Sequence, residues 1–413
     1  MIWSTVAVSL VKAGFPKHSA YNLFLVNEAE AGTTYASTSS NFTLSPKDHI
    51  LVLDLGGGTA NAGSYEIDDD GKLRRELDGL EGNDAGSSQI NELFGKWLWN
   101  RLETERHLIN DVEHRTLEGI YAHIMYRFDS GWKKGVDISN EMTCVWAIPI
   151  PGLKRNERKS FTPGRLCIRR DDLVPIFNPV VDRIVVLGHR QIAAADQKKE
   201  QITKAISVGG FSNSIEVCRR LKLLFEQLNG KRRRKIIFTR SREGYSNGTA
   251  NVSGALICGQ NKSRDLMRIG RTSYGLLFDM PVERNDRKAD EELKYRLKFL
   301  AKRDVIDSQL YIEDMIQNVI YKGTEYLPNV PFRYEIIHNI LRHSEWKAPD
   351  VIVAKDSEAS AKIYPLTHEE NSDCEVVDEF DIDLSYLKDQ CKLTRAPKSG
   401  SMFYEVKILV KVS

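Results

Sequence analysis

The segment ILVLDLGGGTANAGSYEI, residues 50–67, constrains the fold of this 413-residue chain more than any other feature. An apolar run enters three consecutive glycines and a second run leaves them. This pattern predicts two strands joined by a glycine turn. Successive backbone N–H groups in such a turn can form an anion-binding nest, because glycines carry no Cβ to keep a phosphate away. The segment therefore fits either a phosphate-binding loop or a plain hairpin with a glycine bulge.

The side chains at this turn suit phosphate chemistry. Asp54 ends the first strand, and Thr59 follows the three glycines Gly56, Gly57 and Gly58. An aspartate at a strand end can hold Mg²⁺ through its oxygens or through water. The Thr59 hydroxyl would lie next to the bound phosphates. We therefore regard Asp54 as a candidate metal ligand.

Strands alternate with helices around glycine turns over about residues 46–265, which predicts an α/β fold class. We expect a third strand over residues 73–77, a helix from residue 27 to 35 and a helical insertion over about residues 86–180. Asp171 or Asp172 could cap a helix that leads into a longer one from about residue 178 to residue 195. Aromatic side chains in that insertion are expected to face a core. The segment AISVGG, residues 205–210, predicts another buried strand that enters a glycine turn.

The pattern changes in the last third of the chain. Residues 379–387 (EFDIDLSYL) and 402–412 (MFYEVKILVKV) alternate in the manner of strands. We therefore expect a β-rich domain over residues 266–413, without a long helical lid. Helices are expected at residues 4–14 and 288–303.

Composition limits the partners. The formal net charge of +2 is too small to attract nucleic acid or anionic lipid over the whole surface. The sequence has no run of about 18 apolar residues that could span a membrane. The six cysteines form no CxxC pair, which indicates a reducing compartment. We expect a cytoplasmic protein that binds neither nucleic acid nor membrane. The run KRRRK at residues 231–235 leaves a nuclear location open, although a solvated helix end explains it better.

Four segments occur together in one order. They are NEAEAGT (Asn27–Thr33), DLGGGT (Asp54–Thr59), VGGFSNSI (Val208–Ile215) and SGAL (Ser253–Leu256). This set resembles the motifs of the seventy-kilodalton heat-shock family, over roughly residues 1–262.

Two further segments resemble the divergent branch of that family. They are FNPVVDRI at residues 177–184 and RTSYG at residues 271–275. The branch lacks the usual peptide-binding domain and helical lid. The resemblance implies a partial actin-like ATPase (ribonuclease H-like) fold. Residues 1–45 would be a remnant of its first lobe, and residues 46–265 would be its second lobe.

The resemblance also implies site residues and cofactors. Asp54 would lie near Mg²⁺ and the attacking water, with Glu28 facing the same metal and water. Gly56, Gly57, Gly58 and Thr59 would hold the β- and γ-phosphates of ATP or ADP. The adenosine loop would contain three more cofactor-binding residues, Gly209, Gly210 and Phe211. Such parts suit phosphoryl transfer, which depends mainly on positioning and charge neutralisation.

The sequence also departs from the family pattern. We find no counterpart of the family's first phosphate loop, DxGTT, or of the lysine that follows it, and we expect half of the phosphate clamp to be missing. Asn61 replaces an aspartate after the GGGT turn, and Ala29 replaces the proline of NEP. Lys133 and Lys134 are the candidates for the cations that flank adenine in the family.

These observations favour an ATP-binding, chaperone-like protein with weak or absent hydrolysis, whose partners would be the nucleotide and client or co-chaperone proteins. The alternative is a non-catalytic pseudo-ATPase, or an incomplete gene product, that acts as an interaction module. A sugar kinase of the same superfamily fits least, because no sugar-binding segment is recognisable. Under the nucleotide hypothesis, the hairpin at residues 50–67 lies beside the strand ending at Gly209, with both glycine turns on one side of the sheet.

Overall fold

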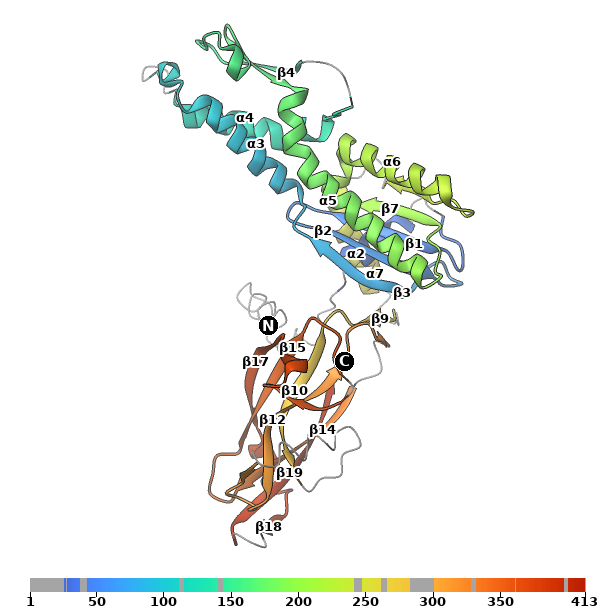
Figure 1. Cartoon of the computed structure of the whole chain (residues 1–413), viewed down its shortest axis with the longest axis vertical. Helices are drawn as coiled ribbons and strands as arrows, with labels where there is room; N and C mark the ends of the chain where they lie inside the picture. Colours follow the sequence, from blue (N-terminus) through green and yellow to red (C-terminus); the bar gives the residue numbers. More distant parts are fainter. Residues whose placement is uncertain are drawn as a thin grey trace. The chain divides into compact units, whose positions relative to one another are not determined.

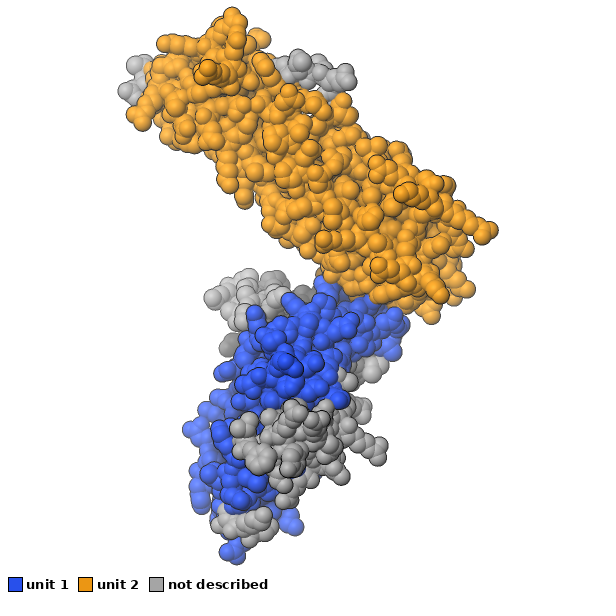
Figure 2. All heavy atoms as spheres, viewed as in Figure 1, with its two compact units in different colours: residues 1–23, 265–413 blue, residues 24–264 orange. Residues whose placement is uncertain are grey.

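The chain divides into two compact units, which Figure 2 colours separately. One unit comprises residues 24–264, and the other comprises residues 1–23 and 265–413. The computed structural model describes residues 26, 28–37, 43–110, 115–139, 144–240, 247–260, 266–282, 301–327, 332–360, 362–396 and 400–412. The helix expected at residues 4–14 and most of the one expected at 288–303 lie outside these ranges.

A five-stranded sheet with the order β3-β2-β1-β7-β8 forms the centre of the unit 24–264 (Figure 1). Its strands are β1 (His49–Leu55), β2 (Ala60–Ile67), β3 (Leu73–Asn83), β7 (Lys204–Val208) and β8 (Ile237–Arg240). Strands β1, β2 and β3 pair antiparallel, whereas β7 runs parallel to β1 and β8 runs parallel to β7. The predicted hairpin and the mixed α/β class are confirmed. Strand β3 extends beyond the expected residues 73–77.

Helices cover both faces of this sheet (Figure 1). They are α2 (Glu28–Ser37), α5 (Arg170–Gln197), α6 (Ile215–Lys231) and α7 (Asn247–Gln260). A Cβ at Gly188 of α5 would contact the Leu53 side chain, whereas a Cβ at Gly32 of α2 would meet Val208. Because neighbouring strand residues point to opposite faces, Leu53 faces α5 and Asp54 faces the opposite side.

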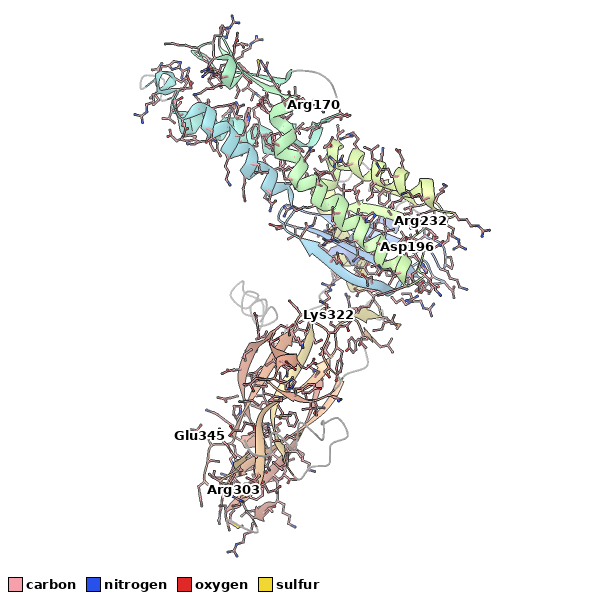
Figure 3. The ribbon with its side chains drawn as sticks, viewed as in Figure 1. Arg170, Asp196, Arg232, Arg303, Lys322 and Glu345 are labelled. Atoms are coloured by element: carbon pink, nitrogen blue, oxygen red, sulfur yellow. The ribbon has the colours of Figure 1, made fainter. Side chains whose placement is uncertain are left out.

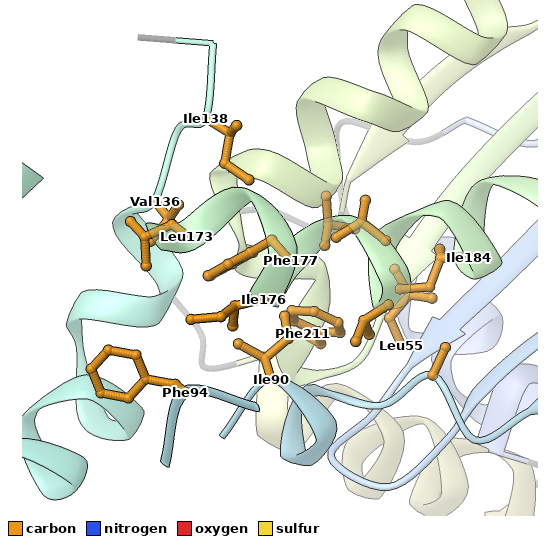
Figure 4. Close-up of a cluster of buried hydrophobic side chains, with 14 of the residues drawn as sticks. Leu55, Ile90, Phe94, Val136, Ile138, Leu173, Ile176, Phe177, Ile184 and Phe211 are labelled. Carbon is orange, nitrogen blue, oxygen red and sulfur yellow. The ribbon is translucent and has the colours of Figure 1, made fainter. Parts of the chain in front are cut away.

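Helix α5 corrects one expectation. The sequence suggested a short helix capped at Asp171 or Asp172 and a second helix from about residue 178. The structure instead has one 28-residue helix that contains Pro175 and Pro179. A continuous buried stripe, which includes Phe177 of Figure 4, stabilises the helix across both prolines. At the start of α5, the Asp172 carboxylate accepts a hydrogen bond from the Arg169 backbone N–H at 2.9 Å.

Polar contacts hold both ends of α5. Figure 3 labels Asp196 at the end of α5 and Arg232 just after α6, and these two side chains form an ion pair. At the other end of α5, the Arg170 guanidinium donates to the backbone carbonyl of Ile138 at 2.6 Å. These contacts fasten α5 to its neighbours at both ends.

The helical insertion contains two helices and a small sheet. These elements are α3 (Ser87–Leu102), α4 (Leu117–Ser130), β4 (Cys144–Pro149), β5 (Phe161–Thr162) and β6 (Arg165–Arg169). Phe94 is fully buried and stacks on Phe128 with 3.8 Å between ring centroids. Trp97 and Trp99 pack at the border of the same core. The expectation that these aromatics face a core is confirmed.

Strands make up the described part of residues 266–413. The longer ones are β10 (Ser273–Pro281), β12 (Leu310–Ile320), β14 (Phe332–Leu341), β15 (Lys347–Lys355), β17 (Cys374–Asp383) and β19 (Met402–Val412). The short ones are β9 (Arg268–Ile269), β11 (Lys302–Arg303), β13 (Glu325–Tyr326), β16 (Tyr364–Pro365) and β18 (Leu393–Arg395).

Long antiparallel pairs such as β10–β12 and β14–β19 build this β-rich unit. Among its described residues, helical structure is limited to 3-10 turns, which confirms the β-rich expectation. Side-chain hydroxyls help to hold the sheet edges. For example, Ser273 accepts the backbone N–H of Lys322, labelled in Figure 3, at 2.9 Å. No helix in the described ranges of the whole chain is long and apolar enough to cross a membrane.

Candidate functional site

Two glycine turns meet at one edge of the sheet. Strands β1 and β7 run parallel, with Asp54 opposite Val208. The GGGT turn follows β1, and the turn at residues 209–213 follows β7. Because parallel strands end at the same edge, both turns lie on one side of the sheet, as the sequence predicted. The crevice outside such carboxyl ends is the usual ligand site of α/β sheets.

Asp54 is the buried acid of this edge. Only 2% of the residue is exposed, and its carboxyl group interacts with Glu28 of α2 and Asn251 of α7. Burial, followed by the nearby charge of Glu28, raises the pKa of Asp54 to about 6, against the opposing hydrogen bond from Asn251. The structure therefore brings together the two carboxylates, Asp54 and Glu28, that the resemblance assigned to the metal and water.

Asn251 is a site residue that the sequence analysis missed. It lies two residues before the SGAL segment, on the same helix. Its amide holds Asp54, but its Oδ1 atom is buried and has no hydrogen-bond partner among the described residues. A buried acceptor without a partner is costly and marks a place where a ligand or water can bind. Its position two residues before SGAL was the only signal in the sequence.

Gly209 brings bare backbone against Asp54. Its φ is +85°, and a Cβ there would lie 2.8 Å from Asp54 Oδ1 and 2.5 Å from the Leu55 carbonyl oxygen. Only glycine fits both the conformation and the space. At the next residue, Gly210, a Cβ would meet no atom within 4 Å. The loop therefore offers an open backbone surface beside the Asp54 carboxylate.

The rest of this second turn is rigid. The Ser212 backbone N–H and hydroxyl both donate to the Gly209 carbonyl, at 3.2 and 2.6 Å. Phe211 is 4% exposed, and its ring lies in the hydrophobic core near Ile90 in Figure 4. Among the predicted cofactor-binding residues, Phe211 can therefore meet a ligand only through its backbone.

The GGGT turn is anchored on the start of α3. Gly56 donates to the Thr59 carbonyl at 2.9 Å, which closes the turn. Ser87 and Ser88, at the start of α3, donate their backbone N–H groups to the carbonyls of Gly56 and Gly57, at 3.1 and 2.8 Å. These bonds satisfy two of the helix's free N-terminal donors and fix the turn in place.

The outer part of this turn is open. Gly57, Gly58 and Thr59 are exposed, and within the described ranges their backbone N–H groups meet no acceptor. Free successive N–H groups can bind a phosphate. The Thr59 hydroxyl accepts from the Asn61 side-chain amide at 3.3 Å. The structure thus leaves three backbone donors available where the sequence predicted phosphate contacts.

Lys133 occupies a different role from the one considered for it. Its ammonium group is nearly buried and donates to Ser87 O at 3.3 Å, Asn91 Oδ1 at 2.9 Å and Asp129 Oδ1 at 2.6 Å. Lys133 therefore links the end of α4 to the first turn of α3. The backbone of that first turn is hydrogen-bonded to the GGGT turn. Lys134 is exposed.

Helices α2 and α7 cross below Asp54. A Cβ at Gly254 would lie 1.8 Å from the Ala31 carbonyl oxygen, and a Cβ at Gly32 would lie 2.7 Å from Val208 Cγ2. Gly254 lets α7 pack closely on the backbone of α2, and Gly32 lets α2 pack closely on β7. This packing positions Glu28 and Asn251 beside the Asp54 carboxylate. The crossing also explains why glycine is needed at position 254 of SGAL.

The donor set fits a magnesium–nucleotide complex. Mg²⁺ in such sites takes one or two carboxylates together with substrate phosphates and water, and Asp54 and Glu28 supply two carboxylates. The described residues contain no group of three or more histidine, cysteine, aspartate or glutamate side chains, as an all-protein metal cage would need. In sequence comparison, neither a protein-family model nor a curated protein matches the chain.

Proposed function

We propose that this chain binds ATP or ADP with Mg²⁺ at the sheet edge formed by the two glycine turns. One observation carries the proposal: the Asp54 carboxylate lies between Glu28, Asn251 and the bare backbone of Gly209. A metal next to phosphates needs this combination of anionic oxygens and uncovered backbone.

Different residues would bind different parts of the ligand. Asp54 and Glu28 would hold Mg²⁺, which neutralises phosphate charge when bound. The exposed N–H groups of Gly57, Gly58 and Thr59 would bind the β- and γ-phosphates. The open backbone at Gly209 and Gly210 would pack against the adenosine and its α-phosphate.

The fold supports a place in the actin-like ATPase superfamily. Three antiparallel strands followed by two parallel ones, with helices on both faces, is the arrangement of a ribonuclease H-like sheet, and the order β3-β2-β1-β7-β8 matches it. The crossing of α2 and α7 at Gly254 supports the same assignment. Within that superfamily, we propose a chaperone-like cytoplasmic protein related to the seventy-kilodalton heat-shock class, whose partners are client or co-chaperone proteins.

We expect hydrolysis to be slow or absent. Asn61, which stands where the family has an aspartate, is neutral, and its amide donates to Thr59. It therefore contributes less charge to a metal shell than a carboxylate would. The same observation favours the second candidate function, a non-catalytic pseudo-ATPase that uses nucleotide binding or the fold itself for interaction with other proteins.

Thermal unfolding with and without Mg-ADP tests the binding proposal. A ligand at about 100 times its Kd stabilises the folded state by about 2.7 kcal/mol, so Mg-ADP should raise the melting temperature of the wild type. Asp54→Ala should abolish the rise. Asp69→Ala, an exposed carboxylate in the turn after β2, is the matched control and should keep it. An equal rise in Asp54→Ala would refute the site.

A further inference from the structure

We propose that a pocket between α4 and the end of β4 binds a small carboxylate with an apolar body. The pocket has a volume of about 310 Å³, which is at the lower end of the usual range of small-molecule sites, roughly 300–1,000 Å³. It lies in the helical insertion, and none of its lining residues belongs to the two glycine turns. The proposal therefore stands independently of nucleotide binding.

The floor of the pocket is apolar. Ile120 and Ile124 lie one turn apart on one face of α4, and Ile124 is buried. Ile148 and Ile150, which are two residues apart and both buried, close the pocket from the side of β4. This floor favours a hydrocarbon group over a fully polar ligand.

Basic side chains line the walls of the pocket. They are Arg115, His123 and Arg127, and within the described ranges no acidic side chain lines it. Arg115 is held in place, because its Nε and Nη1 atoms donate to the carbonyls of Leu108 and Pro151 at 2.8 and 3.2 Å.

Arg127 is the better placed of the two arginines for binding an anion. Its guanidinium lies 4.9 Å from the centre of the Trp132 ring, which orients it by a cation–π contact. Among the described residues it pairs with no carboxylate within salt-bridge distance. An arginine positioned in this way can bind a carboxylate with two parallel hydrogen bonds.

The apolar floor and the Arg127 guanidinium together select for the charge and the shape of a ligand. A ligand of about eight carbons with one carboxylate would place its chain on the isoleucines and its anionic end at Arg127. An ammonium of the same length would contact the same floor but be repelled by the Arg127 guanidinium. This difference in sign distinguishes a built site from non-specific hydrophobic binding.

Calorimetric titration of the full chain with octanoate and with octylammonium tests the proposal. We expect a 1:1 octanoate complex with a Kd of about 1 mM or tighter, which is reasonable for a ligand of this size. Octylammonium should bind at least about tenfold more weakly, a difference of about 1.4 kcal/mol. Equal affinity for the two ligands, or no octanoate binding at 10-fold above about 1 mM, would overturn the proposal.

Two variants and one control on α4 locate the binding. Gly119→Leu should fill the pocket, since Gly119 is exposed, lines it and has only Thr116 Oγ1, at 3.2 Å, close to a built Cβ. Leucine is also the better helix former, so folding should be retained. Arg127→Gln removes the anion-binding charge, and Tyr126→Ala changes a residue that is 73% exposed and outside the lining.

We expect octanoate affinity to fall at least about tenfold in Gly119→Leu and in Arg127→Gln, and to stay within about twofold in Tyr126→Ala. Circular dichroism of each variant confirms folding before titration. Should Gly119→Leu fail to fold, Arg127→Gln decides alone, because its side chain is exposed. Unchanged binding in a folded Gly119→Leu or in Arg127→Gln would contradict the assignment.

Discussion

Asp54 and Gly209, which are 155 positions apart in the chain, are in direct contact: the Asp54 Oδ1 atom lies 2.8 Å from the point where a Cβ of Gly209 would be. The acid near the end of β1 and the glycine that follows β7 therefore form one structural unit. Any side chain at residue 209 would displace the carboxylate that faces Glu28 and Asn251.

Gly209→Ala should destabilise the protein. The new Cβ would lie 2.5 Å from the Leu55 carbonyl oxygen, and the φ of +85° is unfavourable for alanine. We expect a loss of about 2 kcal/mol or more in the free energy of unfolding, measured by urea denaturation. Gly210→Ala is the neighbouring control, because its Cβ would meet no atom within 4 Å, and it should stay within about 0.5 kcal/mol. Equal losses in the two variants would contradict the packing around Asp54.

Asp54→Asn should stabilise the ligand-free protein at high pH. The folded-state pKa of Asp54, about 6, lies above its ordinary value of 3.8, so the wild type loses stability as the pH rises from about 4 to about 6. The full shift corresponds to about 3 kcal/mol. We therefore expect Asp54→Asn to exceed the wild type in urea denaturation at pH 8, with a chelator present, and by a smaller margin at pH 5. A variant that is less stable than the wild type at pH 8 would show that the buried charge is compensated.

Gly254→Ala should disrupt the crossing of α2 and α7. The methyl group would lie 1.8 Å from the Ala31 carbonyl oxygen, and backbone cannot move aside as a side chain can. A loss of about 3 kcal/mol or more is expected, by comparison with other overpacked sites. Gly259→Ala, in the same helix with no atom within 4 Å of its Cβ, should instead gain up to about 1 kcal/mol from helix propensity. Thermal and urea unfolding measure both changes.

Lys133→Met should weaken the support of the GGGT turn. It removes three hydrogen bonds, to Ser87, Asn91 and Asp129, from a nearly buried ammonium group. We expect a loss of about 1–3 kcal/mol, towards the lower end because Asp129 can recover solvent contact. Lys134→Met, the exposed neighbour, should change the free energy of unfolding by less than about 0.5 kcal/mol. A loss in Lys134→Met as large as in Lys133→Met would argue against the buried role.

Local sequence patterns predicted the elements that carry the site. The run at residues 50–67 specified both strands and the turn, because an apolar run broken by three glycines has few other solutions. Residues 205–210 specified β7 and its turn in the same way. The parallel pairing of Asp54 with Val208 places both strands at the centre of one sheet.

Other features depend on contacts that sequence patterns do not encode. Asn251 meets Asp54 only because Gly254 lets α7 cross α2 closely. Lys133 was a candidate for a cation that flanks adenine, but the 3-10 turn after α4 buries its ammonium group against the first turn of α3. Helix α5 looked broken, because Pro175 removes a backbone donor, yet its buried face stabilises it as one helix.

Calorimetric titration with Mg-ATP, followed by a phosphate-release assay, tests the nucleotide site most directly. We expect 1:1 binding by the wild type, with little phosphate release. Asp54→Ala should bind at least about tenfold more weakly, since it removes the carboxylate buried beside Gly209, whereas Asp69→Ala should bind as the wild type does. No heat of binding in the wild type, or equal affinity in Asp54→Ala, would contradict the proposed site, and brisk Asp54-dependent turnover would contradict the expectation of slow hydrolysis.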